Sequence, residues 1–263
     1  MSLLAGKHAV VVGATGTIGI HIAQAFAAQG AVVSLLGRTA LQARARLEPQ
    51  LTPYSPSSSS SSSSDTPSGH RFIQLDVADR AKIRDVFAAR GPQHQPEHVD
   101  TVGPLDILVN CAGISQTTFL KRTPDEELAS IIDTNLLATM LVCKHAKVRP
   151  NGCIINVSSL MATKSSLGVT AYSASKAGVV GFTRALCREL AARSIRVNAL
   201  LPGWVQSSMW DYLKPELQQA YLKDTPLHRV AHPAEVADAA IFLASNGFAN
   251  NCILNLDGGL SAV

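Results

Sequence analysis

Aromatic and charged residues are scarce in this sequence, and both shortages exclude a class of protein. Only 5% of the 263 residues are aromatic and 16% are charged, while 46% are hydrophobic. A nucleic-acid surface needs clustered lysine and arginine side chains with aromatic residues between them, and the net charge of +4 comes without such a cluster. We therefore predict a core filled by aliphatic side chains and no nucleic-acid partner.

Paired cysteines, long apolar runs and a clear metal motif are also missing. The five cysteines are widely spaced without a C-x-x-C pair, which favours reduced thiols in an intracellular protein. We expect the cytoplasm or the mitochondrial matrix. No run approaches the roughly 18 apolar residues of a membrane-spanning helix, so we expect no membrane partner. His94 and His98 lie four residues apart, but Pro92 and Pro96 oppose the helix that would align them, so no metal site is predicted.

What the sequence does contain is a series of apolar runs that alternate with helical segments. The runs lie at residues 8–13, 31–36, 72–77, 105–110, 153–158, 196–201 and 252–256. The clearest helical segments are residues 17–29, 171–192 and 233–244. This alternation predicts right-handed crossovers and a single α/β domain over residues 1–263. We expect a doubly wound, Rossmann-type fold with a mostly parallel seven-stranded sheet and helices on both faces.

One segment interrupts the alternation. Residues 53–69 are of low complexity and include eight consecutive serines at 57–64. Such a segment cannot bury enough apolar surface to offset the entropy of ordering the chain, so we predict a disordered surface loop inserted in the domain. A loop regulated by phosphorylation is the alternative. Residues 91–104, rich in glycine, proline and histidine, are interpreted as a second loop.

The first apolar run ends in a glycine-rich turn, V-V-G-A-T-G-T-I-G, at residues 11–19. Glycines between a strand and a helix let backbone amides approach a pyrophosphate at the positive end of the helix dipole. The spacing here is G-x-x-G-x-x-G rather than the usual G-x-G-x-x-G, but we predict the same role. The residues assigned to the pyrophosphate are Gly13, Thr15, Gly16, Thr17, Ile18 and Gly19.

The second run distinguishes between the two nicotinamide cofactors. Enzymes that use NAD usually carry an acidic residue about 20 positions after the turn, which binds the ribose 2′-hydroxyl. Residues 32–47 contain no Asp or Glu, and Arg38 follows the strand instead. Arg38 can bind a 2′-phosphate through two hydrogen bonds, so we predict NADP(H); an ordinary surface arginine is the alternative. Adenine and ribose are expected near Asp76, Val77, Asn110, Ala112 and Gly113.

Tyr172 and Lys176 lie four residues apart near the start of a predicted helix, and therefore on one face. A phenol has a pKa of about 10, which a nearby ammonium, together with the oxidised nicotinamide, lowers by stabilising the phenolate. We predict that Tyr172, its pKa lowered in this way, protonates a carbonyl oxygen as hydride reaches the carbon. Ser158 and Ser159 end the fifth run at the edge where ligands bind, and either hydroxyl can hold that oxygen.

These motifs resemble those of the short-chain dehydrogenase/reductase family, in its compact branch, over nearly the whole chain. N-C-A-G (110–113), D-T-N-L (133–136), P-G-W-V (202–205) and L-D-G-G (256–259) match family elements. The resemblance implies a catalytic tetrad of Asn135, Ser159, Tyr172 and Lys176. In this tetrad Ser159 orients the substrate and Asn135 supports a proton-relay water, while Lys176 binds the nicotinamide ribose. Contacts to the cofactor are also implied for Pro202, Gly203, Val205 and Ser207.

Within the family, the chain most resembles the 3-oxoacyl-carrier-protein reductases and their mitochondrial carbonyl reductase type. The resemblance implies reduction of a β-keto thioester by NADPH, as in fatty-acid synthesis, with an acyl carrier protein as a partner that faces Arg188. A plain surface arginine is the alternative for Arg188. The resemblance also implies a homotetramer or dimer built on two paired helices and the last strand. Two alternatives stay open: a ketoreductase or alcohol dehydrogenase of specialised metabolism, and a non-catalytic NADP-binding subunit of a hetero-oligomer.

The chain departs from the family pattern at several positions. Thr17 stands where the turn T-G-x-x-x-G-x-G has a glycine, and the basic residue often found there is missing. Trp204 is bulky for its place, and Ser207 replaces the usual threonine. The segment before the fifth run is short, which is expected to trim an interface helix. G-x-x-G-x-x-G itself is typical of the family's extended branch, and the other motifs outweigh it.

Overall fold

The computed structural model describes residues 2–55, 65–88 and 101–262. The serine run at 57–64 lies outside these residues, as do His94, His98 and most of the segment 91–104. The two loop predictions and the prediction that these histidines bind no metal therefore stay predictions.

Seven strands form one sheet in which each neighbouring pair runs parallel, in the order β3-β2-β1-β4-β5-β6-β7. The strands are β1 (His8–Val12), β2 (Val32–Gly37), β3 (Arg71–Gln74), β4 (Leu105–Asn110), β5 (Val148–Val157), β6 (Arg196–Pro202) and β7 (Ile253–Leu256). Every residue of β1 and β2 is buried, as expected for parallel strands covered on both faces. The predicted doubly wound, Rossmann-type sheet is thus confirmed.

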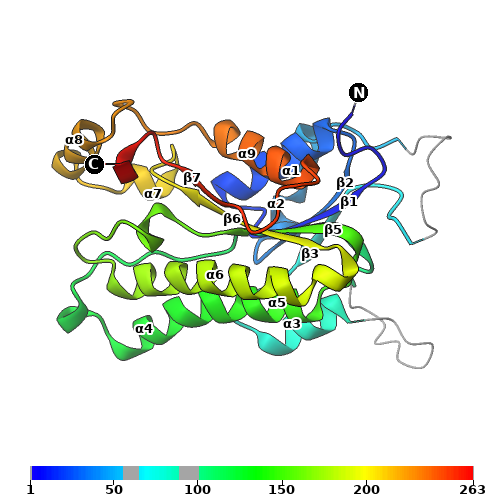
Figure 1. The fold of residues 1–263 in the computed structure, drawn as a ribbon, viewed down its shortest axis with the longest axis horizontal. Helices are drawn as coiled ribbons and strands as arrows, with labels where there is room; N and C mark the ends of the chain where they lie inside the picture. The colour runs from blue at the N-terminus through cyan, green and yellow to red at the C-terminus, as the bar shows by residue number, and fades with distance from the viewer. Residues whose placement is uncertain (1, 56–64, 89–100, 263) are drawn as a thin grey trace.

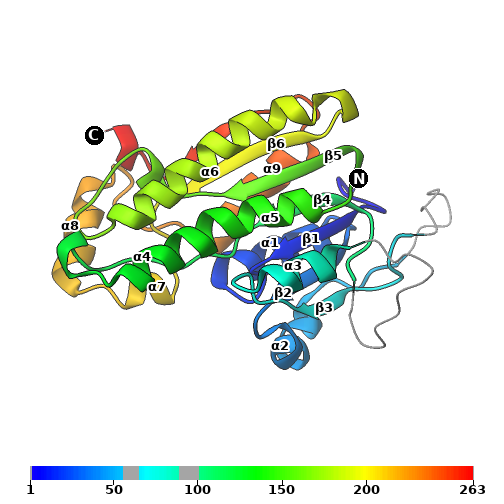
Figure 2. The same cartoon turned by 90° about the horizontal axis from the view of Figure 1, so that it is seen from below.

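Helices cover both faces of the sheet (Figure 1). They are α1 (Thr17–Ala28), α2 (Ala40–Leu47), α3 (Arg80–Phe87), α4 (Asp125–Ile132), α5 (Ala138–His145), α6 (Thr170–Glu189), α7 (Ser208–Asp211), α8 (Pro215–Asp224) and α9 (Pro233–Ser245). The first face is packed by α1, α2 and α9. Figure 2 shows α3 to α6 in front of the other face. Beyond the end of the sheet, α7 and α8 form a lid.

Some boundaries differ from the predicted ones, each for a local reason. The fifth strand begins at Val148 rather than at residue 153, because Val148 pairs with Leu105 before a register shift. The helix predicted to reach residue 192 ends at Glu189, and a left-handed residue, Ser194, turns the chain into β6. Since α5 ends at His145, close to β5, the short segment predicted before the fifth strand is also found.

At the amino ends of the strands, polar side chains bind one another. Asp106 Oδ2 accepts hydrogen bonds from the His8 backbone N–H at 2.8 Å and from Arg149 Nη1 at 2.9 Å. The buried His8 ring lies 2.8 Å from the Pro104 carbonyl through Nδ1 and 2.9 Å from Ser34 Oγ through Nε2. Because a carbonyl can only accept, Nδ1 carries the proton and Nε2 accepts from the serine.

The described residues contain neither a membrane-spanning helix nor a cluster of metal ligands. No helix in them is long and apolar enough to cross a bilayer. No three His, Cys, Asp or Glu side chains gather there in a set that could hold a metal ion. The five cysteines, all of them described, are free thiols.

Candidate active site and cofactor cleft

The glycine-rich turn lies at the carboxyl end of β1 and is pressed against the N-C-A-G segment after β4. Gly13 has a φ of +83°, and a Cβ atom there would lie 2.6 Å from the Ala112 amide nitrogen. A Cβ atom at Gly19 would lie 2.3 Å from the Gly13 carbonyl oxygen. Gly16 is less crowded, with 3.4 Å to the same oxygen. Two of the three glycines are therefore required by packing alone.

The first turn of α1 has no side-chain cap, so its backbone N–H groups are suited to binding an anion. Gly16 is the N-cap residue, no side chain caps the helix, and its first turn carries no acidic residue. Backbone N–H groups at a helix N-terminus that lack partners favour a negatively charged ligand. The turn that contains Thr17 and Ile18 thus fits the pyrophosphate predicted for it, and a side chain at Gly16 would stand at its entrance.

Arg38 lies at the carboxyl end of β2, exposed beside the same turn. Among the described residues it pairs with no carboxylate, whereas Arg44 is held by Glu48 at 2.9 Å. Thr15 lies under the strand end, since a Cβ atom at Gly37 would be 3.0 Å from its hydroxyl oxygen. That hydroxyl accepts a hydrogen bond from Thr39 Oγ1 at 3.3 Å. Thr39 is a candidate phosphate ligand that the sequence analysis missed.

The residues predicted beside adenine and ribose are partly brought together. A small pocket next to α5 is lined by Val77, Asn110 and Ala112, together with Thr134. Asp76 is not among its lining residues; it is exposed and caps its own turn by accepting from the Ala78 N–H at 3.0 Å. Three of the five residues predicted beside adenine and ribose therefore line one pocket.

The Asn110 side chain forms hydrogen bonds with other side chains of the protein. Its Nδ2 donates to Asn156 Oδ1 at 2.9 Å and to Cys143 Sγ at 3.3 Å. Asn156 Nδ2 in turn donates to the Thr183 hydroxyl at 2.9 Å. This buried chain of hydrogen bonds joins β4, β5 and α6, so Asn110 holds the sheet edge in shape beneath the cleft.

The four predicted catalytic residues converge at the carboxyl ends of β4 and β5. Lys176 Nζ lies 5.8 Å from the Tyr172 ring centroid and donates to the Val157 carbonyl at 3.0 Å. A Cβ atom at Gly113 would lie 3.1 Å from Asn135 Oδ1 and 3.3 Å from Lys176 Nζ. The glycine of N-C-A-G therefore leaves the space in which these two side chains approach each other.

Asn135 lies in a π-helical turn (Asp133–Leu137) that joins α4 and α5. Its Oδ1 accepts from the Ile114 N–H at 2.8 Å, and its Nδ2 donates to the Ile114 carbonyl at 2.9 Å and to Ser175 Oγ at 3.0 Å. The side chain thus clamps the segment after β4 onto α6. Support of a relay water by Asn135 stays a prediction.

The two serines at the end of β5 have different partners. Ser158 is buried, and its hydroxyl donates to the Lys176 carbonyl at 2.8 Å. Ser159 is less buried and caps a short 3₁₀ turn by accepting from the Met161 N–H at 3.1 Å. The Ser159 side chain also interacts with the Tyr172 phenol. Of the two hydroxyls, Ser159 is the one placed at the tyrosine, in agreement with the tetrad.

The lowering of the Tyr172 pKa by Lys176 together with the oxidised nicotinamide stays a prediction for that state; in the chain alone the shift has the opposite direction. Burial raises the pKa of this phenol above its usual value, and the hydrogen bond with Ser159 only partly opposes the rise. Burial also lowers the pKa of the Lys176 ammonium to about 8. Desolvation is the largest cause of both shifts, because both side chains are enclosed by the protein.

Pro202, Gly203, Val205 and Ser207 form the base of the lid. The Gly203 N–H donates to the Leu256 carbonyl at 2.9 Å, and a Cβ atom at this glycine would lie 2.8 Å from Asp257 Cα. Val205 is buried and bridges to Ala231, and the Ser207 hydroxyl donates to the Val205 carbonyl at 3.0 Å. The segment is tied to the last strand and the start of α9, and its contact with a nicotinamide stays a prediction.

Aromatic side chains fill the space under the lid. The Trp204 ring lies 5.5 Å from that of Trp210 and 4.6 Å from that of Tyr221. The Tyr221 hydroxyl is 2.9 Å from the Ser166 hydroxyl, so α8 is hydrogen-bonded to the loop before the catalytic tyrosine. The sequence analysis noted Trp204 as bulky but missed the two partners of its ring.

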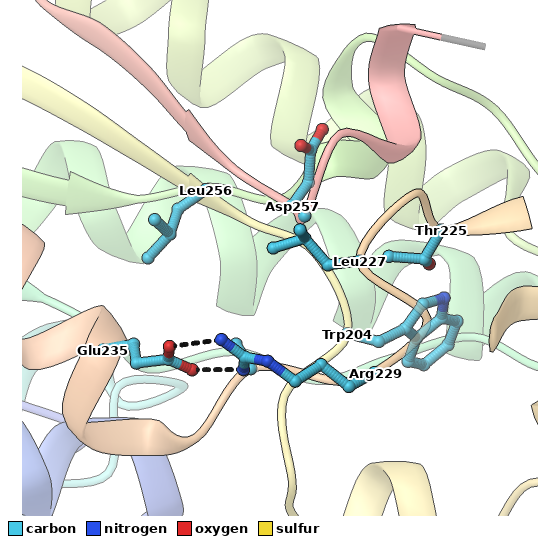
Figure 3. Close-up of a pocket in the computed structure, with 9 residues that line it drawn as sticks. Trp204, Thr225, Leu227, Arg229, Glu235, Leu256 and Asp257 are labelled. Atoms are coloured by element: carbon cyan, nitrogen blue, oxygen red, sulfur yellow. Dashed lines mark hydrogen bonds and ion pairs between the residues drawn. The ribbon is translucent and has the colours of Figure 1, made fainter.

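A pocket that includes Trp204 is lined by uncharged residues and by three charged ones, Arg229, Glu235 and Asp257 (Figure 3). Arg229 binds both carboxylate oxygens of Glu235 at 2.7 Å. This pair, with the His232 backbone N–H, lowers the pKa of the Glu235 carboxyl to about 2. The Arg229–Glu235 pair fastens the end of the lid to α9, while the Asp257 carboxylate accepts hydrogen bonds from the N–H groups of Gly259 and Ser261, each at 3.0 Å.

Comparison with known proteins gives one consistent result. A family model described as enoyl-(acyl carrier protein) reductase matches residues 13–261. The chain is 36% identical to the 3-oxoacyl-[acyl-carrier-protein] reductase FabG of Chlamydia muridarum, over 99% of both chains. It is 33% identical to the human 3-oxoacyl-[acyl-carrier-protein] reductase, over 98% of this chain and 99% of that one. These relatives match along nearly their whole length.

A solved structure gives the same picture. It is a protein of Agrobacterium tumefaciens, described as a candidate 2-deoxy-D-gluconate 3-dehydrogenase and solved with bound NADP. The TM-score is 0.81 at 28% identity, over 99% of this chain and 98% of that one. Fold and sequence thus agree on one family.

Proposed function

The chain is a member of the short-chain dehydrogenase/reductase family, an oxidoreductase that uses NAD(P), and from this premise we propose that it reduces a ketone to a secondary alcohol with NADPH. One observation carries the proposal: four side chains that the reaction needs converge beside the glycine-rich turn. They are Asn135, Ser159, Tyr172 and Lys176.

The cofactor cleft fits a dinucleotide on two observations. The N-terminus of α1 offers uncapped amides, and glycines stand where a Cβ atom would collide with the neighbouring segment. When bound, the nicotinamide supplies the hydride that the carbonyl carbon receives. The residues that would hold the cofactor are Gly13, Thr15, Gly16, Thr17, Ile18, Gly19, Arg38, Asp76, Val77, Asn110, Ala112, Gly113, Tyr172, Lys176, Pro202, Gly203, Val205 and Ser207.

The choice of NADPH rests on Arg38. Its guanidinium is free of carboxylate partners among the described residues, so it is available for a 2′-phosphate. The hydroxyls of Thr15 and Thr39 lie next to it and can donate to the same group. No acidic residue occupies the end of β2 to bind a 2′-hydroxyl.

Tyr172 holds the proton that the carbonyl oxygen receives. Because burial raises the pKa of its phenol, the side chain is protonated near neutral pH, which is the state required of an acid in the direction of reduction. Ser159 donates a hydrogen bond to the carbonyl oxygen and so orients it towards the phenol. Both hydroxyls lie at the sheet edge, where the substrate enters beneath the lid.

Lys176 stabilises the phenolate that remains after proton transfer. With a pKa of about 8 its ammonium is mostly charged near pH 7, and the Val157 carbonyl fixes its position at 3.0 Å. The same ammonium is placed to bind the nicotinamide ribose, while Asn135 keeps the segment after β4 in contact with α6. The protein therefore supplies the acid and the counter-charge from α6 and the orienting group from the end of β5.

The substrate that we propose is a 3-oxoacyl thioester, carried by an acyl carrier protein or coenzyme A. Support comes from full-length relatives at 33–36% identity that are named 3-oxoacyl-[acyl-carrier-protein] reductases. The test is loss of NADPH absorbance with acetoacetyl thioesters of both carriers. No turnover of any β-keto thioester, with turnover of other ketones, would reject this substrate.

A bulkier or cyclic ketone is the second candidate. The observation that favours it is the aromatic cluster of Trp204, Trp210 and Tyr221 under the lid, which offers flat apolar surfaces. A panel of cyclic and polyketide-like ketones, assayed beside the thioesters, separates the two candidates by kcat/KM. Bound NADPH without turnover of any ketone would instead indicate a non-catalytic subunit.

For the carrier, we propose that exposed arginines of α6 provide the docking charge. Arg184 and Arg188 lie one helical turn apart on the exposed side of this helix. Arg188→Glu is expected to raise KM about tenfold for a carrier-bound substrate and to leave KM for a small thioester unchanged. We also propose a homotetramer or dimer, because Phe242 on α9 and Phe248 before β7 are 46% and 99% exposed. Light scattering tests the assembly.

A further inference from the structure

The loop after β4 carries a buried glutamine that the mechanism above does not use. Gln116 is 1% exposed and has four hydrogen bonds. Its Oε1 accepts from the backbone N–H groups of Ala171 at 2.8 Å and Tyr172 at 3.3 Å. Its Nε2 donates to the Thr118 carbonyl at 3.0 Å and to the Thr123 hydroxyl at 3.1 Å. Every polar atom of the side chain is thus engaged.

Helix α6 depends on this glutamine for its cap. Its N-cap residue is Val169, which has no side-chain acceptor, and its first turn contains no acidic residue. The first N–H groups of a helix have no partner within the helix and are usually satisfied by a nearby Ser, Thr, Asp or Asn. Here the acceptor comes from Gln116, more than fifty residues earlier in the chain. It contacts the turn that carries Tyr172.

A second buried amide fastens the same loop to the same helix. Asn135 holds Ile114 by both backbone groups and donates to Ser175 Oγ, which itself donates to the Tyr172 carbonyl at 2.7 Å. The Tyr172 backbone is therefore held at its N–H by Gln116 and at its carbonyl by Ser175. Both contacts lead back to the segment after β4, whose start lines the cofactor cleft.

We propose that Gln116 is a positioning residue for Tyr172. By binding the first turn of α6 to the loop after β4, it fixes the phenol relative to the segment against which the cofactor lies. The inference deepens the proposed ketone reduction and relies on it only for its kinetic readout. Loss of the Gln116 acceptor is expected to misplace the phenol, and a displacement of about 1 Å costs about 100-fold in rate.

The kinetic experiment compares two variants of Gln116 with a control variant on α6, the helix whose first turn Gln116 binds. Gln116→Met keeps the volume and removes the acceptor, while Gln116→Glu keeps an oxygen towards the two N–H groups. The control variant is Thr183→Val. Thr183 lies eleven residues after Tyr172 on α6, and its buried hydroxyl accepts a hydrogen bond from Asn156 Nδ2 that a valine cannot accept. We expect Gln116→Met to lower kcat by about 10- to 100-fold with KM for NADPH changed less than about threefold, and Gln116→Glu to retain most of kcat.

A purely structural role predicts a different result. In that case Gln116→Met and Thr183→Val would lower the melting temperature alike, and neither would change kcat of the folded enzyme. Equal kcat for wild type and Gln116→Met would overturn the proposal, and so would a loss of kcat in Thr183→Val as large as that in Gln116→Met. The pH profile of kcat adds a second readout, because a misplaced phenol is expected to titrate at a different pH.

Amide hydrogen exchange tests the contact without any substrate. In the wild-type protein the N–H groups of Ala171 and Tyr172 are expected to exchange slowly, although they lie in the first turn of a helix. Exchange of both at the rate of an unprotected amide would refute the proposal even if Gln116→Met failed to fold. If the wild type reduced no ketone, the proposed function would fail while this measurement still decided the role of Gln116.

Discussion

The two ends of the parallel sheet use polar groups in opposite ways. At the amino end, His8, Asp106 and Arg149 bind one another and nearby backbone groups, so the described charges are matched inside the protein. At the carboxyl end of the same strands, α1 has an uncapped N-terminus and Arg38 has no carboxylate partner among the described residues. The polar groups at the amino end bind one another, whereas the α1 amides and Arg38 at the carboxyl end are available to bind a ligand.

This difference predicts that stability and activity depend on opposite ends of the same strands. β1 runs from the buried His8 to the glycine-rich turn. β5 carries Arg149 near its start and ends at Val157, directly before Ser158 and Ser159. Ligands of open α/β sheets bind at the carboxyl ends of strands. Substitutions at the carboxyl end should therefore change kinetics with little loss of stability, and those at the amino end should do the reverse.

The largest effect is expected for Tyr172→Phe. Removing the phenol oxygen removes the acid, so kcat should fall by about 10²- to 10⁴-fold. The free energy of unfolding should change little, since the substitution removes one hydrogen bond, with the Ser159 side chain, and leaves the ring in place. Single-turnover assays with NADPH and a ketone give the rate, and urea denaturation gives the stability. A variant that kept most of its rate would remove Tyr172 from the mechanism.

The amino end should respond to acid through His8. Burial lowers the pKa of this imidazole to about 4, below its ordinary value of 6.5. As the pH falls from 6.5 towards 4, the unfolded chain takes up the proton and the folded chain does not, so stability falls by about 3 kcal/mol. Denaturation at several pH values measures the slope, and His8→Gln is the control that should lose it. If the stability of His8→Gln fell with pH as steeply as that of the wild type, the acid sensitivity would not come from His8.

Arg38→Ala tests the carboxyl end at the cofactor. Loss of a charge-assisted contact to the 2′-phosphate should raise KM for NADPH by about 10- to 100-fold and leave KM for NADH unchanged. Arg44→Ala is the matched control, because Glu48 already binds that guanidinium at 2.9 Å. If the unmodified protein used NADPH and NADH equally well, the cofactor preference would be wrong.

Much of the site is predictable because its signals are local in sequence. Gly13 and Gly19 stand in one turn, and Tyr172 and Lys176 lie one helical turn apart, so the spacing alone places them together. The direction of the Tyr172 pKa is not predictable in this way. It depends on how deeply the phenol is buried, which the sequence does not reveal.

The features that the sequence did not predict depend on contacts between distant segments. Gln116 caps a helix that begins more than fifty residues later, and no spacing rule connects the two. The early start of β5 depends on pairing of Val148 with Leu105, which an apolar pattern centred on residues 153–157 cannot show. The fold was thus predictable from alternation of local elements, whereas the supports of the active site depend on tertiary packing.

A smaller effect is expected for Arg149→Met at the amino end. Its ion pair with Asp106 is partly buried, with side chains 20% and 13% exposed, and the carboxylate keeps its hydrogen bond from the His8 N–H. We expect a loss of about 1 kcal/mol in the free energy of unfolding.

The matched control for Arg149 is an exposed pair. Arg80 and Asp133 are 62% and 46% exposed at 3.2 Å, so Arg80→Met should cost only a few tenths of a kcal/mol. In Arg149→Met KM for NADPH should stay within about twofold of the wild-type value, because Arg149 lies at the amino end. Arg80 is a control for stability alone, because it follows the carboxyl end of β3 and pairs with Asp133 in the turn that carries Asn135. A weakened cofactor affinity in Arg149→Met, at unchanged stability, would mean that the two ends of the sheet do not act independently.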